Sequence, residues 1–152
     1  MLRTDRAYPL DDPPAVVWQA LEQVDGYQRW WPWLQRFDAH VLSEGARWTA
    51  RIRVPVPWSL RIELELHDVR APTSVRAVVT GDVEGTAALT VEPAEMGSVI
   101  RVRSELAPRH RLLQVLHQGV PSVSRRMHDH VIDTAFRQFA DRDRRGGGPP
   151  DR

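Results

Sequence analysis

The residues of this chain best suited to proton transfer are histidines near its C-terminal end. His128, Asp129 and His130 are consecutive and lie in a stretch whose apolar residues have helical spacing. A neutral imidazole, with a pKa of about 6.5, can accept and donate a proton at neutral pH. Side chains two residues apart on a helix point in nearly opposite directions, so His128 and His130 cannot bind one metal ion together. The sequence therefore predicts no metal site here.

His128 has two interpretations. It lies at the margin of a stripe of apolar residues that recur at helical spacing over residues 113–135. Ser124 and Val131 are one helical turn away, and from this position the imidazole could face a cavity. A histidine that only forms hydrogen bonds at the border of the helix fits the same position. The sequence alone leaves the choice between them open.

Two carboxylates occur in the segment Gly81 to Gly85. Asp82 and Glu84 resemble a pair of catalytic carboxylates, but they stand between glycines. Flanking glycines are typical of a tight hairpin, in which Asp is a usual turn residue. We interpret the pair as structural.

Several charged side chains alternate with apolar ones along predicted strands. They are Arg51, Arg53, Arg61, Glu63, Glu65, Arg101 and Arg103. Such residues are expected on a solvated face, where opposite charges on neighbouring strands stabilise the sheet by about 0.2–1 kcal/mol per pair. If the sheet turns the other way locally, an arginine could instead enter a cavity and hold a carboxylate or enolate.

Tryptophan is concentrated in residues 26–34, where Trp30, Trp31 and Trp33 surround a proline. Each indole can bury on the order of 200 Å² and needs a partner for its N–H group. The cluster either anchors short helices against a sheet or lines the mouth of a cavity. Trp48 and Trp58 fall on the apolar faces of neighbouring predicted strands, where core packing and ligand contact are both compatible with their positions.

The N-terminal half begins with a strand and two short helical segments. Residues 2–10 alternate loosely and predict a strand, after which Asp12 and two prolines predict a helix start. That helix is expected to run to about Gln23. A second short helix or turn is expected over residues 26–34, broken by Pro32.

From Phe37 onward the hydrophobic period changes from that of a helix to that of a strand. The alternating runs lie at residues 47–54, 58–67, 74–80, 86–91 and 98–106. The connections between them are short and turn-like, which favours an antiparallel meander.

After Pro108 the apolar residues return to helical spacing. The predicted stripe consists of Leu113, Leu116, Val120, Val123, Met127, Val131 and Ala135. Residues 141–152 contain Arg, Gly, Pro and Asp with little to bury, so we predict a disordered tail there. Residues 1–140 are expected to form a single domain.

Composition excludes several classes of chemistry. The 152 residues contain no Cys, Lys or Asn, which rules out disulfides, thiolate nucleophiles, lysine Schiff bases and N-glycosylation. A formal charge of +1 does not supply the basic surface that nucleic acid requires. The N-terminal residues are too charged for a signal peptide, and no apolar run is long enough to span a membrane. We expect a soluble cytoplasmic protein without a cofactor.

These elements predict an α+β fold, in which a curved antiparallel sheet of about seven strands has one apolar face to cover. The long C-terminal helix is the element able to cover it. A curved sheet closed by one helix can leave space between the two, where small apolar ligands usually bind.

Four segments carry a resemblance to a known family. They are Val-Trp-Gln-Ala-Leu from Val17, Gly-Tyr-Gln-Arg-Trp-Trp-Pro-Trp from Gly26, Gly-Asp-Val-Glu-Gly from Gly81, and Arg-Arg-Met-His-Asp-His-Val from Arg125. In this order they resemble the START-like (SRPBCC) superfamily, and within it the polyketide cyclase/dehydrase branch of small bacterial proteins. The resemblance implies the helix-grip fold, a seven-stranded antiparallel sheet wrapped around a long C-terminal helix with a central cavity.

The resemblance implies a range of functions, because relatives bind lipids, quinones, polyketides or hormones and some cyclise bound chains. Our leading hypothesis is binding of a small apolar molecule between the sheet and the C-terminal helix. The expected ligand-binding residues are Trp30, Trp33, Trp48, Ile52, Trp58, Leu60, Leu64, Leu89, Met127, His128 and Val131.

Two alternatives remain. One is a polyketide cyclase or aromatase that promotes enolisation and aldol closure, with His128 or a cavity arginine as the candidate group, although no catalytic motif matches residue by residue. The other is a protein-interaction or stress-related module that uses an exposed apolar rim around the tryptophans. The sequence also leaves a homodimer open.

Overall fold

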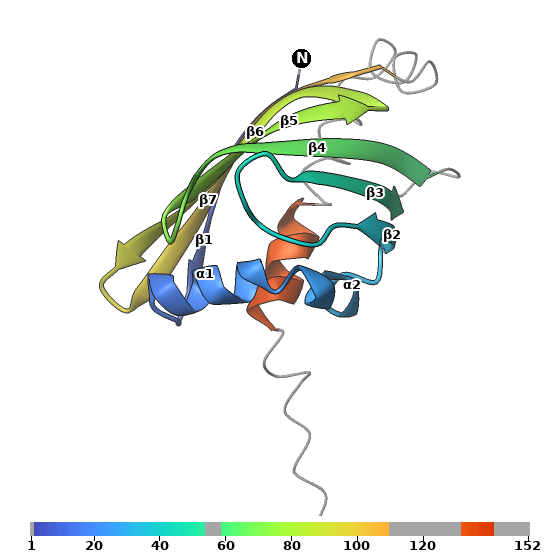
Figure 1. The fold of residues 1–152 in the computed structure, drawn as a ribbon. Helices are drawn as coiled ribbons and strands as arrows, with labels where there is room; N and C mark the ends of the chain where they lie inside the picture. Colours follow the sequence, from blue (N-terminus) through green and yellow to red (C-terminus); the bar gives the residue numbers. More distant parts are fainter. Residues whose placement is uncertain (1, 54–58, 110–131, 142–152) are drawn as a thin grey trace, which may run out of the picture.

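The fold is seen in a computed structural model that describes residues 2–53, 59–109 and 132–141 (Figure 1). The helices are α1 (Pro14–Glu22), the 3-10 helix η1 (Val24–Gly26), α2 (Tyr27–Trp30) and a helix over residues 132–140. The strands are β1 (Leu2–Leu10), β2 (Leu34–Asp38), β3 (Arg47–Arg53), β4 (Ser59–Arg70), β5 (Ser74–Gly81), β6 (Val83–Ala94) and β7 (Gly97–Pro108).

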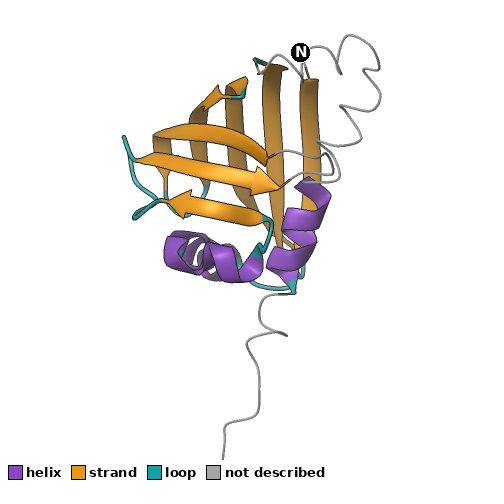
Figure 2. Cartoon of the chain, turned by 90° about the vertical axis from the view of Figure 1, so that its right-hand side faces the viewer, coloured by secondary structure: helices purple, strands orange, loops and turns teal. Residues whose placement is uncertain are grey.

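The strands form one antiparallel sheet in the order β1-β7-β6-β5-β4-β3-β2. The sheet curves over α1, α2 and the helix at 132–140, which all lie on one side of it (Figures 1 and 2). We call that side the inner face. The seven strands and the two short helices after β1 confirm the predicted α+β fold. Of the predicted long C-terminal helix, only residues 132–140 fall within the described part of the chain.

Strand β4 shows why the chain forms this sheet. Leu60, Ile62, Leu64 and Leu66 alternate with the exposed charged residues of the same strand. Successive side chains of a strand point to opposite faces, so this pattern places every leucine and isoleucine on the inner face. The burial of that apolar row stabilises the sheet against the helices.

One local prediction, the helix cap at Asp12, was wrong. Helix α1 begins at Pro14 with Pro13 in the N-cap position and no side-chain hydrogen bond, so Asp12 does not cap it. The two prolines already hold the backbone angles that a helix start needs. The second short helix expected within residues 26–34 is α2, which ends before Pro32, and Leu34 already pairs with Ile52 as the first residue of β2.

The core consists of two clusters of buried side chains. The first cluster packs α1 and the helix at 132–140 on the sheet, and its members are Leu10, Val17, Trp18, Ala20, Leu21, Val91, Ile100, Phe136 and Phe139. The second lies under β2 to β5 and contains Val24, Tyr27, Leu34, Ala39, Trp48, Leu66 and Ala77. Trp30 and Trp31 pack against both clusters and therefore join them. No helix within residues 2–53, 59–109 and 132–141 is long and apolar enough to cross a membrane.

The segment Gly81 to Gly85 spans the end of β5, the connecting residue Asp82 and the start of β6. The Asp82 carboxylate accepts a hydrogen bond from the backbone N–H of Arg61 at 2.8 Å. Glu84 pairs with the guanidinium of Arg109 at 3.5 Å. Both carboxylates thus hold neighbouring chain segments, which favours the structural interpretation of this pair.

Candidate functional site on the inner face of the sheet

The candidate site is a part of the inner face that the two core clusters do not include. The register of the sheet brings together, on this face, Leu60, Ile62, Val79, Gly85, Ala87, Ser104 and Leu106. None of these seven belongs to either cluster that the described residues form. We call them the inner patch. It is an apolar surface with a single side-chain hydroxyl, and five of its residues are only half-buried.

Five of the predicted ligand-binding residues line the inner face beside or within this patch. Ile52 pairs with Leu60, and Leu64 pairs with Trp48 across β3 and β4. Leu89 lies on β6, where it packs against the first cluster. All but Trp48 are half-buried, so their side chains retain surface that a ligand could cover.

Trp30 and Trp33 lie against the helix at 132–140. The ring of Trp30 meets the ring of Phe139 edge-on, with centroids 5.6 Å apart. The indole N–H of Trp33 donates to the side-chain oxygen of Gln138 at 2.8 Å, and that of Trp31 donates to the carbonyl oxygen of Ala135 at 2.7 Å. The tryptophan cluster therefore anchors the short helices to the C-terminal helix, a partner that the sequence did not indicate.

Trp48 is part of the core, with only 7 % of its surface exposed. Its N–H donates to the carbonyl oxygen of Val41 at 2.9 Å, and its ring meets Tyr27 and Phe37 edge-on. Burial raises the pKa of Tyr27, whose neutral hydroxyl donates to the carbonyl oxygen of Leu21. Trp48 thus supports the wall formed by Leu64 and its neighbours.

The remaining predicted site residues, Trp58, Met127, His128 and Val131, lie outside the described residues. Their roles stay predictions.

Sequence analysis missed the polar residues of the inner face near β1. Arg6 falls in the inner register of β1, because it pairs with Val102 of β7. Its guanidinium lies 3.7 Å from the carboxylate of Asp133, and the hydroxyl of Tyr8 donates to the same carboxylate at 2.5 Å. Tyr8 also stacks on Phe136, with ring centroids 4.7 Å apart. Polar and apolar residues alternate only loosely over residues 2–10. That irregular pattern could have indicated that β1 places polar side chains on the inner face.

Comparison with known proteins identifies the family. Residues 1–142 match the family described as polyketide cyclase / dehydrase and lipid transport. The chain belongs to this family. Among curated proteins, none matches it.

Solved structures share the fold of this chain at low sequence identity. A Thermus thermophilus protein is 12 % identical with a TM-score of 0.75, and the match covers 97 % of this chain and 99 % of that one. A Mycobacterium smegmatis protein is 17 % identical with a TM-score of 0.71, covering 96 % and 93 %. A START superfamily protein from the same organism is 8 % identical with a TM-score of 0.69, covering 95 % and 99 %.

The outer face of the sheet carries paired charges. Asp5 lies 3.3 Å from Arg103 and 3.9 Å from Arg101, and Arg3 lies 3.3 Å from Glu105. These residues border a groove of about 790 Å³ on the outer side of β1 and β4 to β7. Because its arginines are paired with carboxylates, the groove has little excess charge. Within the described ranges, no group of three or more His, Asp or Glu side chains is placed to hold a metal ion.

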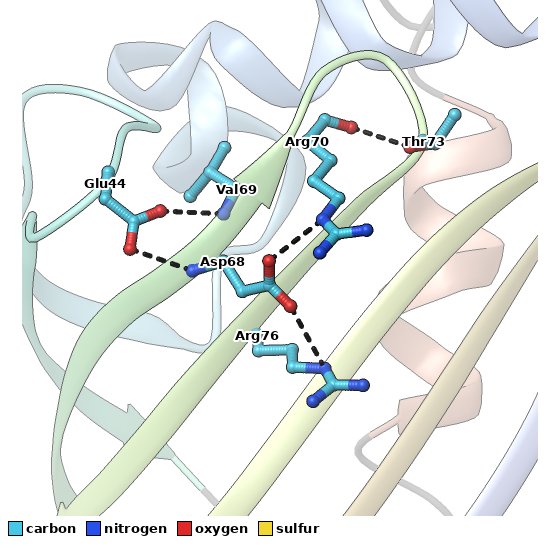
Figure 3. A network of polar contacts seen from close by, with 6 residues as sticks. All are labelled: Glu44, Asp68, Val69, Arg70, Thr73 and Arg76. Atoms are coloured by element: carbon cyan, nitrogen blue, oxygen red, sulfur yellow. Dashed lines mark hydrogen bonds and ion pairs between the residues drawn. The ribbon is translucent and has the colours of Figure 1, made fainter.

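A polar clamp ties the loop before β3 to strand β4 (Figure 3). Both oxygens of the Glu44 carboxylate accept hydrogen bonds at 2.9 Å, one from the backbone N–H of Asp68 and one from that of Val69. Asp68 has a φ of +51° at an irregularity of the strand, and its carboxylate pairs with Arg70 at 2.9 Å and Arg76 at 3.7 Å. The left-handed backbone turns both amides toward Glu44.

The hydrogen bonds from Val69 and Asp68 hold the pKa of Glu44 below its usual value of 4.5. A carboxylate with a lowered pKa in the folded state stabilises that state above its unfolded pKa, and this contribution is lost as the pH falls through the folded pKa. We therefore expect the clamp to persist at neutral pH and to open only in acid below 4.5.

Replacement of Glu44 by alanine is expected to speed amide hydrogen exchange at Asp68 and Val69 at neutral pH, because both N–H groups lose their acceptor. The matched control is Glu63→Ala, which removes an exposed carboxylate from the outer face of β4. Exchange measured residue by residue checks the prediction. Equal exchange at both amides in the Glu44 and Glu63 variants would contradict it.

Proposed function

We propose that this protein binds a small, largely apolar molecule against the inner face of its sheet. The observation that carries the proposal is the inner patch, an apolar surface that neither core cluster includes. The family description, which names lipid transport, and the START-like fold both support a hydrophobic ligand. We place this activity in the cytoplasm, as the composition predicts.

The proposed contacts follow from the sheet register. Leu60 and Ile62 of β4 would meet one side of the ligand, and Leu89 of β6 the other. We retain the remaining predicted residues as further contacts: Trp30, Trp33, Trp48, Ile52, Trp58, Leu64, Met127, His128 and Val131. Affinity would come mainly from buried apolar area, at about 25 cal/mol per Å² before the cost of association.

The family description also names cyclases and dehydrases, so catalysis of a cyclisation is the alternative function. The histidine suited to proton transfer in such a reaction, His128, lies outside the described residues. Binding is therefore the function that the described residues support best.

Two neighbouring alanines of β6 provide a test of the binding face. Ala87 lies on the inner face and Ala88 on the outer face, and both are half-buried. Leucine at Ala87 would cover part of the inner patch. We expect Ala87→Leu to weaken binding of an apolar ligand about tenfold or more, whereas Ala88→Leu should leave it unchanged.

The ligand for this test comes from a thermal-shift screen of the wild-type protein with fatty acids, quinones and aromatic polyketides. The dissociation constants of the best compound are then measured for both variants by calorimetry. A screen in which no compound raises the melting temperature would refute the proposal. So would equal loss of affinity in the two variants, because binding would then not depend on the inner face.

A further inference from the structure

The inner patch contains a buried hydroxyl that has no hydrogen-bond partner. Ser104 of β7 has 6 % of its surface exposed, and its Oγ makes no hydrogen bond to any residue that the structure describes. A buried polar group left without a partner destabilises the folded state, so such groups are rare and call for an explanation. A polar atom of a bound ligand is one partner that would satisfy it.

Ser104 stands at one end of a row of small side chains. In the register of the sheet it pairs with Thr4 on one side and with Ala87 on the other, and Ala87 pairs with Ala77. The neighbouring row along the strands contains the larger side chains of Val102, Leu89 and Val75. A ligand lying along the row of small side chains could therefore approach the sheet closely and reach the hydroxyl with one end.

Among the described residues, the charged side chains of the inner face nearest to Ser104 are already paired. Arg6, one row away on β1, faces the carboxylate of Asp133, which also accepts the hydrogen bond of Tyr8. A ligand carboxylate placed there would meet a guanidinium that Asp133 has neutralised. Burying such a second anion is costly unless it has its own partner charge. An uncharged oxygen avoids that cost.

We infer that the ligand of the inner face carries an uncharged hydroxyl or carbonyl group, which hydrogen-bonds to Ser104 Oγ while its apolar body covers Ala87 and the rest of the inner patch. This inference rests on the proposed function and narrows it to apolar alcohols, phenols and ketones. Ser104 can serve either type, because a serine hydroxyl both donates and accepts.

Three probes of similar shape test the inference: naphthalene, 2-naphthol and 2-naphthoate. We expect 2-naphthol to bind about three- to tenfold more tightly than naphthalene, and Ser104→Ala to remove that difference without weakening naphthalene. Ser74→Ala is the matched control, because Ser74 is a half-buried serine on the outer face of β5. Dissociation constants come from titrations that follow ligand fluorescence.

The outcomes separate the two proposals. If 2-naphthoate binds most tightly, or if Ser104→Ala leaves the preference for 2-naphthol intact, the inference is overturned and the proposed function stands. If none of the probes, and no compound of the screen, binds the wild-type protein, the proposed function fails and the inference fails with it.

A measurement without ligand gives an independent check. Removing an unpartnered hydroxyl should raise the melting temperature of the free protein by about 2–4 °C in Ser104→Ala. Ser74→Ala should change it less. A lower melting temperature for Ser104→Ala would indicate that the hydroxyl already has a partner, such as a bridging water, and would overturn the inference.

Discussion

Replacement of Phe139 by alanine is expected to lower the free energy of unfolding by about 3–5 kcal/mol. Phe139 is fully buried in the first core cluster. Its ring lies 5.6 Å from the ring of Trp30 and 6.5 Å from that of Trp31, measured between centroids. Truncation would remove the aromatic contact that joins the helix at 132–140 to the tryptophan cluster and would leave a cavity.

Urea denaturation followed by tryptophan fluorescence measures this loss. Arg137→Ala is the matched control on the same helix, because Arg137 is exposed and should change stability by no more than about 0.5 kcal/mol. A Phe139→Ala variant as stable as the Arg137→Ala variant would contradict the assignment of Phe139 to the core.

The sheet could be predicted from the sequence because strand alternation is a local pattern. Strand β1 begins and ends where the alternation of residues 2–10 indicates, and β4 extends the predicted run at 58–67 to Arg70. Inner and outer faces could also be assigned strand by strand, as the leucines of β4 illustrate. Period alone decides which side of a strand is apolar.

The partners of the tryptophans could not be predicted in this way. Trp31 donates to Ala135, which is 104 residues away in the chain, and Tyr8 donates to Asp133 at a separation of 125. Hydrophobic pattern shows that a side chain will be buried but not which distant element buries it. The sequence therefore indicated the cluster and missed the helix that it contacts.

The hydroxyl of Ser104 and its lack of a partner among the described residues could not be predicted from the sequence, for a related reason. Ser104 interrupts the apolar alternation of β7, and sequence analysis treats such a residue as a neutral exception. Its place between Thr4 and Ala87 depends on the registers of two strand pairs. Only the assembled sheet shows that the exception lies beside other small residues of the inner face.

The irregularity of β4 at Asp68 is another feature that could not be predicted from the sequence. The alternation of β4 is regular up to His67, yet the register shifts between His67 and Arg70. The positive φ of Asp68 is stabilised by Glu44, which belongs to a loop more than twenty residues earlier. Aspartate tolerates this conformation better than most residues, but that tendency does not locate the irregularity.

Gly85→Ala is expected to destabilise the fold by about 3–5 kcal/mol, through backbone strain and overpacking together. Gly85 has a φ of +151°, which side chains other than hydrogen rarely allow. A Cβ there would lie 1.8 Å from the carbonyl oxygen of Glu105 on β7, so the backbones of β6 and β7 would have to separate.

Gly45→Ala is the control that separates the cost of the steric clash from the cost of placing a side chain at a positive φ. Gly45 also has a positive φ, of +80°, but a Cβ there would meet no atom within 4 Å. This control should cost only about 1–2 kcal/mol. Denaturation of both variants measures the difference in the free energy of unfolding, and equal losses of stability would contradict the proposed close contact.

The same pair of variants should differ in ligand binding. Gly85 pairs with Leu106, two residues from Ser104. Separation of β6 and β7 should therefore weaken binding of 2-naphthol in Gly85→Ala, whereas Gly45→Ala should bind 2-naphthol as the wild-type protein does.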